Sequence, residues 1–356
     1  MTPTPNVPAR LGLALLLFFA LDAAAFRTGY YARLLEPNST AGYLQTYLWN
    51  EEHRPIEGPN QVLAVGDSRM GLKARVANAL TGETGYTFGT IAVPGTTPRC
   101  WYYMLREVDP AAGRYAFIIV PFDTYDDRDW EDHRDRELDI NYLTPLLRAT
   151  DFFTFTFSFP SWTGRAHAAE AVLFKGLAYQ HDFQDFLARR RTRLEDARLN
   201  HQHAREWFYN SVWERHSLAG MSVDYAARAV RLPDWVTGAK RREIEEVLLR
   251  DPPPPSPEYA SYRRQWLGAI VERYRGSRTR LLFLRLPRGP VVRPGLPEDA
   301  AGSIRDLARS GRIVLAPEHQ FDVLERPELF GDAMHLNEQG GTEFSMMLAR
   351  WVGRMH

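Results

Sequence analysis

Short apolar runs with almost no charge alternate along the chain with longer stretches in which apolar and polar positions recur at helical spacing. Five of the apolar runs have the length of buried strands, and most of them stop at glycine or proline. They are residues 61–65, 86–93, 115–120, 281–286 and 313–316. The amphipathic stretches predict helices over residues 69–80 and 98–108, and a last helix that begins after Asn337.

This order of elements predicts the fold class. Strands without charges are typical of a parallel sheet whose two faces are both covered by helices. We therefore expect an α/β protein over residues 61–354, with three α/β/α layers and a mostly parallel, flavodoxin-like, doubly wound sheet. In such sheets ligands bind at the carboxyl ends of the strands.

A long interruption separates the third predicted strand from the fourth. It spans roughly 160 residues, far more than an ordinary crossover connection needs. Helical patterns dominate there, so we expect a large helical insertion at about residues 126–278. The helices predicted within it cover residues 167–198, 204–214, 240–249 and 259–274.

The N-terminal part of the chain contains an apolar run, Leu11 to Phe26, which only Asp22 interrupts and which arginines flank. A positive end followed by such a run is typical of an export signal. Two fates are open: cleavage after the small residues 23–25, or retention as a membrane anchor. We favour the anchor, because the tyrosines that follow resemble an aromatic collar at a membrane interface. Either way, the rest of the chain is expected to be exported.

Residues 1–31 are thus interpreted as a signal-anchor or signal peptide, and residues 32–60 as a connector. The globular domain would lie in the periplasm or elsewhere outside the cytoplasm. Within the insertion, the phenylalanines between positions 153 and 159 alternate strictly with polar residues, which predicts a half-buried strand. The alternative is that these side chains enter the interface of the bilayer.

Composition excludes several functions. Lys and Arg together number 44, as do Asp and Glu, so the formal net charge is zero. A nucleic-acid-binding protein would carry a basic excess, so no nucleic-acid partner is expected. The single cysteine, Cys100, excludes an internal disulfide and a cysteine-based zinc site. We expect neither a metal nor a cofactor.

Candidate chemistry lies where strands end. Gly66-Asp67-Ser68 follows the first predicted strand and would expose the serine hydroxyl at the edge of the sheet, at the start of a helix whose amides favour negative charge. Asp332 and His335 precede the last helix. In a joint site, His335 would take a proton from Ser68, and Asp332 would orient the imidazole. Arg69, next to the serine, is interpreted as an exposed first-turn arginine, with contact to an anionic substrate as the alternative.

These motifs together resemble the SGNH (GDSL-type) hydrolase superfamily, specifically its membrane-anchored cell-envelope branch. The resemblance covers about residues 61–125 and 280–354, and it makes Ser68 the nucleophile. Asp332 and His335 match the family's C-terminal block Asp-x-x-His-Leu-Asn-x-x-Gly. The second block of the family supplies a glycine amide to the oxyanion hole beside the amide of the serine itself. Here Gly95 is the better candidate for that glycine, and Gly89 the reserve.

One departure from the family concerns the third block, Gly-x-Asn-Asp, whose asparagine donates to the oxyanion. This chain has Pro121-Phe122-Asp123-Thr124 instead. An ionised carboxylate cannot donate a hydrogen bond and would repel an oxyanion. Either Asp123 is protonated, or it is turned away and two backbone amides suffice. Loss of one such donor typically costs about 2.7–4 kcal/mol.

The resemblance implies a serine-dependent esterase or O-acyltransferase. The substrate class would be O-acyl (acetyl-like) groups of cell-envelope or exported polysaccharide, and a membrane-bound O-acyltransferase would be a possible partner. The helical insertion would be a cap over the site or an interaction platform. The alternative is a catalytically silent relative that binds glycan or scaffolds a membrane-bound O-acyltransferase, and Asp123 favours that alternative.

Overall fold

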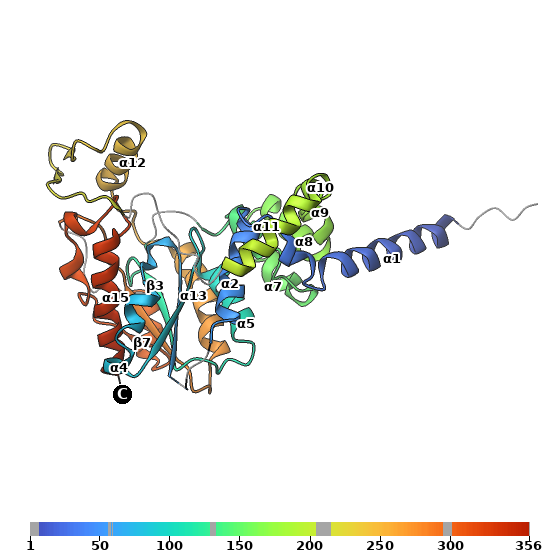
Figure 1. Cartoon of the computed structure of the whole chain (residues 1–356), viewed down its shortest axis with the longest axis horizontal. Helices are drawn as coiled ribbons and strands as arrows, with labels where there is room; N and C mark the ends of the chain where they lie inside the picture. The colour runs from blue at the N-terminus through green and yellow to red at the C-terminus, as the bar shows by residue number, and fades with distance from the viewer. Residues whose placement is uncertain are drawn as a thin grey trace, which may run out of the picture. The chain divides into compact units, whose positions relative to one another are not determined.

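The computed structural model describes residues 7–55, 58, 60–128, 133–203, 215–294 and 301–355. It divides into two compact units (Figure 1). The helical unit consists of residues 1–52 and 133–207, and the sheet unit consists of residues 53–132 and 208–356.

The sheet unit is built on a five-stranded sheet in which every neighbouring pair of strands is parallel. The strand order is β2-β1-β3-β6-β7, and β1 and β3 are buried at every residue. This confirms the predicted α/β class, and each strand lies within two residues of its predicted run. The strands are β1 (Gln61–Gly66), β2 (Thr87–Ala92), β3 (Phe117–Phe122), β6 (Arg280–Arg285) and β7 (Val314–Leu315).

Helices cover both faces of this sheet, which is why its strands carry so little charge. Figure 1 shows α13 (Pro257–Arg273) and α15 (Glu338–Gly353) on opposite sides of the strands. On the first side α13 packs against α5 (Pro98–Val108) and α14 (Ser303–Arg309). On the second side α15 packs against the short helices of residues 74–78 and 81–84.

A further segment of the sheet unit holds the hairpin β4 (Ser222–Asp224) and β5 (Ala229–Arg231), followed by α12 (Gly238–Leu249). Its buried apolar residues, Ile244 among them, belong to the same core cluster as Leu284 of β6. The predicted helices over 240–249 and 259–274 are confirmed as α12 and α13, and both belong to the sheet unit. The hairpin was not predicted.

The prediction of a helix that starts directly after the serine and runs over residues 69–80 is wrong. The chain instead forms a single 3₁₀ turn, η2 (Ser68–Met70), and then α3 (Ala74–Asn78) and α4 (Thr81–Thr84). Gly71 ends the turn with a φ of 59°, in the left-handed region that glycine enters at little cost. A three-residue turn has no helix dipole of the kind that the sequence suggested.

The helical unit contains α1 (Val7–Phe26), η1 (Tyr31–Leu34) and α2 (Thr40–Glu52), so part of the expected connector is helical. Its second segment forms α6 to α11, and the predicted helix over 167–198 is confirmed as four shorter helices. The predicted helix over 204–214 lies outside the described residues. These elements are α6 (Glu137–Leu143), α7 (Phe152–Thr156), α8 (Trp162–Leu173), α9 (Lys175–Ala178), α10 (Gln180–Ala188) and α11 (Arg190–His203).

The alternating phenylalanines do not form the predicted strand. Residues 152–156 are helical, and the turn continues as far as Phe159. Phe155 and Phe159 are fully buried, whereas Phe153 and Phe157 are exposed. An i, i+4 pair shares one face of a helix, so the same alternation divides the four rings between two faces.

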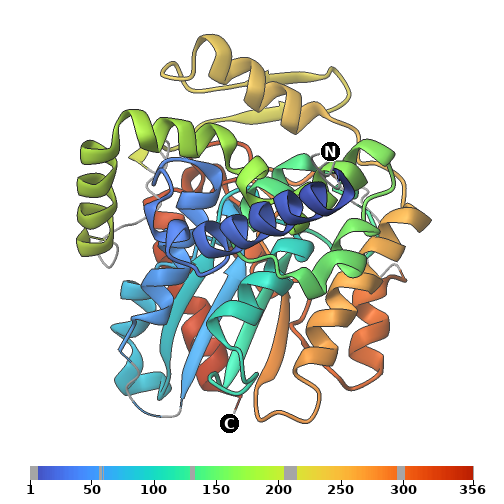
Figure 2. The ribbon, with the colours of Figure 1, turned by 90° about the vertical axis from the view of Figure 1, so that its right-hand side faces the viewer.

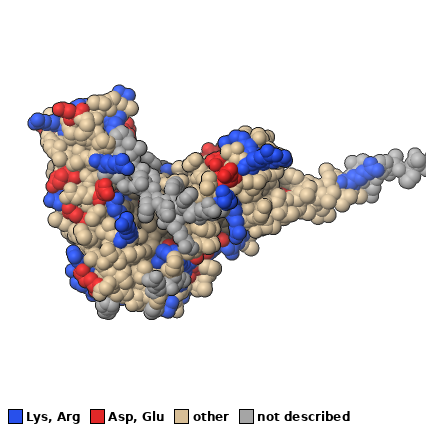
Figure 3. Space-filling view, viewed as in Figure 1, with Lys and Arg blue, Asp and Glu red and all other residues tan. Residues whose placement is uncertain are grey.

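Helix α1 is long and apolar enough to cross a membrane, and a signal sequence would meet the same criterion. In Figure 3 most of its surface is free of charged side chains. Its C-terminal end is joined to the rest of the helical unit. Asp22 accepts a hydrogen bond from the amide of Gly176 at 2.6 Å, and Arg27 donates to the carbonyl oxygens of Val172 and Leu173 at 2.8 and 2.7 Å.

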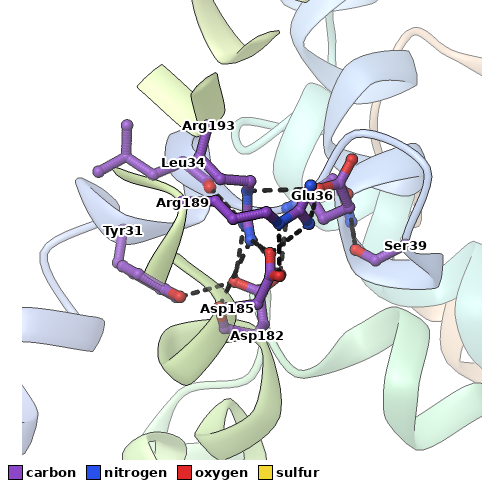
Figure 4. A network of polar contacts seen from close by, with 9 residues as sticks. Tyr31, Leu34, Glu36, Ser39, Asp182, Asp185, Arg189 and Arg193 are labelled. Atoms are coloured by element: carbon purple, nitrogen blue, oxygen red, sulfur yellow. Dashed lines mark hydrogen bonds and ion pairs between the residues drawn. The ribbon is translucent and has the colours of Figure 1, made fainter. Parts of the chain in front are cut away.

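A buried polar network then fixes the chain that follows α1 (Figure 4). The guanidinium of Arg193 is fully buried and pairs with Asp182 and Asp185 at 3.0 and 2.6 Å. It also donates to the carbonyl oxygen of Leu34 at 2.8 Å, while the hydroxyl of Tyr31 donates to Asp182 at 2.6 Å. The segment after α1 is therefore an integral part of the helical unit.

Candidate active site

The serine of the Gly-Asp-Ser motif lies just beyond the carboxyl end of β1, in the first position of η2. The side chain of Asp67 caps this turn by accepting a hydrogen bond from the amide of Arg69 at 2.9 Å. Gly66 permits the close approach of β3, since a Cβ at this position would lie 2.7 Å from Cγ of Pro121. Pro121 thus packs directly against the glycine of the serine motif.

A tight loop before α15 carries the other two candidate residues. An antiparallel bridge between Phe330 and Leu336 closes the loop, and the amide of Gly331 donates to the carbonyl oxygen of His335 at 3.0 Å. Inside it, Oδ1 of Asp332 accepts hydrogen bonds from the amides of Met334 and His335 at 2.9 and 2.8 Å. The aspartate therefore orders the backbone of the loop as well as facing the histidine.

Asn337 anchors this loop to α15 and to its surroundings. Its side-chain oxygen accepts from the amide of Gly340 at 2.9 Å, which makes it the N-cap that the sequence predicted. Its side-chain nitrogen donates to the carbonyl oxygens of Glu328 and His216 at 2.8 and 3.1 Å. Asn337 thus ties the end of the loop to α15 on one side and to residues 216 and 328 on the other.

The three predicted triad residues meet in space. Oγ of Ser68 lies 2.9 Å from Nε2 of His335, although the two residues are 267 positions apart. Nδ1 of His335 lies 2.9 Å from Oδ2 and 3.0 Å from Oδ1 of Asp332. A carboxylate accepts from Nδ1–H, so Nε2 is left unprotonated and can accept the serine proton. This is the arrangement of a nucleophile, a base and an orienting carboxylate.

Asp332 is buried, and burial by itself would raise its pKa. The hydrogen bonds and charge of His335, together with the backbone amides of Met334 and His335, outweigh burial and hold the pKa of this carboxyl well below its usual range. Nζ of Lys240 lies 3.4 Å from Oδ2 of Asp332, and both side chains are largely buried. Lys240 belongs to α12, and its approach to Asp332 was not predicted, because no motif links the two residues.

The predicted oxyanion glycine lies in a loop bound to the end of β1. The amide of Val93 and the hydroxyl of Thr96 both donate to the carbonyl oxygen of Gly66, each at 2.9 Å. Gly95, between them, has a φ of 72°. Gly89, the reserve candidate, lies within β2, where it pairs with Leu63, and so is not at the carboxyl edge of the sheet.

Asp123 follows β3 and forms an ion pair with Arg69. Its Oδ1 lies 2.5 Å from Nη1 of Arg69, while Nη2 of the same guanidinium lies 2.7 Å from Oδ2 of Asp67. Arg69 is therefore an ion-paired, partly buried side chain, and its interpretation as an ordinary exposed arginine is wrong. Burial alone would lower the pKa of Arg69 and raise that of Asp67, but the ion pairs reverse both shifts.

No protein family, characterised protein or solved structure matches this chain. The family resemblance therefore depends on the motifs and on the geometry that they adopt. Of the candidates, Ser68, His335 and Asp332 come together, and Gly95 lies in the loop bound next to them. Within the described part of the chain, no group of three or more His, Cys, Asp or Glu side chains is placed to hold a metal ion.

Proposed function

We propose that this protein is an SGNH-type serine esterase or O-acyltransferase. The observation that carries the proposal is the hydrogen-bonded series from Ser68 through His335 to Asp332 at the carboxyl edge of a parallel sheet. Numbered along the chain, the five strands have the order 2-1-3-4-5, which is that of a flavodoxin-like, doubly wound sheet. Ligands of such sheets bind at this edge.

The chemistry would be two-step acyl transfer. Oγ of Ser68 attacks the carbonyl carbon of an ester, and Nε2 of His335 takes the hydroxyl proton. The tetrahedral intermediate collapses, the bond to the leaving alcohol breaks, and His335 returns the proton to that alcohol. Water or a sugar hydroxyl then attacks the acyl-serine with the same proton transfers, which releases an acid or a new ester.

The oxyanion of each intermediate would be bound by the amides of Ser68 and Gly95. The charge of Asp123 is balanced by Arg69, which reduces the repulsion that an isolated carboxylate would exert. This ion pair takes the place of the family's neutral asparagine.

The substrates that fit this proposal are O-acyl groups of cell-envelope or exported polysaccharide, handled together with a membrane-bound O-acyltransferase. The sheet unit would be exported and anchored by α1. We propose that α1 is retained as an anchor, because cleavage after residue 25 would remove Asp22 from its contact with Gly176.

The experiment that tests the activity is labelling of the full-length protein in detergent with a fluorophosphonate probe, followed by peptide mapping. We expect modification at Ser68 that is lost in Ser68→Ala and in His335→Ala. Ser310→Ala is the matched control, because this serine lies on the exposed end of α14 and contacts only nearby residues. Labelling at a different serine, or labelling that survives Ser68→Ala, would refute the nucleophile assignment.

The second candidate function is a catalytically silent protein that binds glycan or scaffolds an acyltransferase. Asp123 favours it, because the position of a hydrogen-bond donor in the family holds an acceptor here. The two functions differ in the same experiment: a folded protein that takes no label and hydrolyses no acetyl ester, yet retains acetylated polysaccharide on a column, would establish the second.

A further inference from the structure

Helix α1 has only just the length of a membrane span. Its 20 residues extend about 30 Å, which is the thickness of the hydrocarbon core of a typical bilayer. A helix of this length crosses the core only if nearly all of it lies within the bilayer. At most about one turn at its C-terminal end can stand clear of the hydrocarbon core.

The C-terminal half of α1 is packed against the helical unit. The rings of Phe18 and Phe19 lie 6.2 and 5.4 Å from that of Phe174, and the ring of Phe26 lies 5.4 Å from that of Phe183. A Cβ on Gly176 would come within 3.0 Å of the ring of Phe26, so this contact is close. The segment from Phe18 to Phe26 covers about 13 Å of the helix.

These two observations together place part of the helical unit at the depth of the bilayer. If α1 spans, the residues packed against its C-terminal half lie within the hydrocarbon region or at its border. Leu177 of α9 is 48% exposed, and a lipid contact beside α1 would cover this side chain. Asp22 does not oppose this placement, because it is 4% exposed and is bonded to Gly176 and Arg27.

A second apolar surface lies on the same unit, and we call it the aromatic patch: Phe153, Phe157 and Trp162. Their exposed fractions are 73%, 57% and 81%. The rings of Phe153 and Phe157 are stacked, and the guanidinium of Arg165 lies 5.7 and 5.3 Å from the ring centroids of Phe157 and Trp162. Aromatic rings beside an arginine are typical of a membrane interface.

The patch is connected to α1 through a single helix. Trp162 begins α8, and the carbonyl oxygens at the other end of α8 accept hydrogen bonds from Arg27. The 12 residues of α8 extend about 18 Å, so the patch lies close to the base of the anchor. In Figure 2, which is seen from the side toward which α1 points, the green helices of this part of the chain lie around α1.

We propose that the helical unit is seated on the bilayer: α9 contacts lipid beside α1, and the aromatic patch inserts into the interface. The ligand of this surface is the membrane itself. The proposal rests on the retention of α1 as an anchor and is independent of catalysis.

The test measures depth with a fluorophore on single cysteines. In a Cys100→Ala background, nitrobenzoxadiazole is attached to Phe157→Cys, Leu177→Cys or Leu16→Cys of the full-length protein. The protein is reconstituted in vesicles of phosphatidylcholine with a minority of phosphatidylglycerol, with and without spin-labelled lipid. Arg198→Cys is the control, since this exposed residue lies on α11, on the side of the unit away from the free end of α1 in Figure 1.

We expect a blue-shifted emission and quenching by spin-labelled lipid at positions 157 and 177, and neither at position 198. Quenching at Leu16→Cys alone would agree with α1 as an anchor, but it would overturn the proposal that the helical unit is seated on the bilayer. Absence of quenching at Leu16→Cys would overturn the anchor itself. Fluorophosphonate labelling of the same samples at Ser68 reports on catalysis separately.

Discussion

Arg69 lies between two carboxylates beside the candidate nucleophile, and under the proposed function its charge offsets theirs near the oxyanion. Its guanidinium is paired with Asp67 and Asp123. The pairing joins the residue after the serine to the residue after β3. Arg69 and Asp123 therefore form one ion-paired unit.

We predict that Arg69→Met slows fluorophosphonate labelling at least about tenfold, since two unpaired carboxylates then lie near the developing negative charge. Arg69→Met/Asp123→Asn should regain part of the rate, because the second change removes one of those charges and restores a neutral amide. The two changes should be non-additive by about 1–3 kcal/mol, as for residues in direct contact. Purely additive effects would show that Arg69 and Asp123 affect the labelling rate independently of each other.

Acid should lower the unfolding free energy by protonating individual carboxylates of the candidate site. The pKa of Asp332 and that of Asp67 are both lowered in the folded protein. Both carboxylates therefore stabilise the fold at pH values above the pKa that they have in the unfolded chain, which is near 4. Their contribution is lost as the pH falls below that value. We predict that Asp332→Asn has a smaller loss of unfolding free energy between pH 5 and about pH 3 than the parent protein, measured by urea unfolding.

The triad residues could be predicted because each belongs to a short motif next to a predicted element: Ser68 after the first strand, and Asp332 and His335 before the last helix. The pairing of Arg69 with Asp123 and the approach of Lys240 could not be predicted. Both depend on how segments far apart in the chain pack, and neither leaves a local pattern.

At the scale of elements, helix α12 contributes the ammonium group of Lys240 to the candidate site. Lys240 and Asp332 are both largely buried, so we predict that Lys240→Met costs about 1–3 kcal/mol of unfolding free energy at pH 7 by leaving the carboxylate with one partner fewer. Arg241→Met on the same helix is the control. Its partner is Glu245 on an exposed face, so it should cost well under about 1 kcal/mol. Equal effects in urea unfolding would argue against the buried pair.

The contact between β1 and β3 is a second element-scale feature. Gly66→Ala should cost about 1–3 kcal/mol, because its Cβ would overlap Pro121. Pro121→Ala removes the overlapping Cγ and should recover part of that loss in the double variant. Thermal unfolding measures both, and a double variant no more stable than Gly66→Ala alone would mean that the strain arises elsewhere.

The main strands could be predicted because each is an apolar run with at most one charged residue that ends before glycine or proline. Other elements follow weaker signals. Helix α2 was missed because the turn residues around it made the region resemble a connector. The strands of the hairpin β4–β5 have only three residues each. Phe153 to Phe159 has a strand's alternation, yet two buried rings and two exposed rings satisfy the same pattern on a helix.

At the scale of the molecule, α1 belongs to the same compact unit as the segment of residues 133–203. We predict that protein isolated from membranes retains residues before Ala25, as determined by intact mass. Asp22→Ala should make the helical unit more sensitive to protease, since the Gly176 amide loses its acceptor, while the exposed Arg10→Ala should not. A mature chain that begins at Phe26 would contradict the retained anchor.

Ser68 and His335 are 267 positions apart in the chain, so they are synthesised at different times. Ser68 is synthesised early, directly after β1, whereas His335 is synthesised only after β6 and β7. Until then the serine is an ordinary alcohol with no base beside it. For a chain that is exported as proposed, the serine and the histidine meet only after translocation. Under that proposal, Ser68 is not activated by His335 while the growing polypeptide is in the cytoplasm.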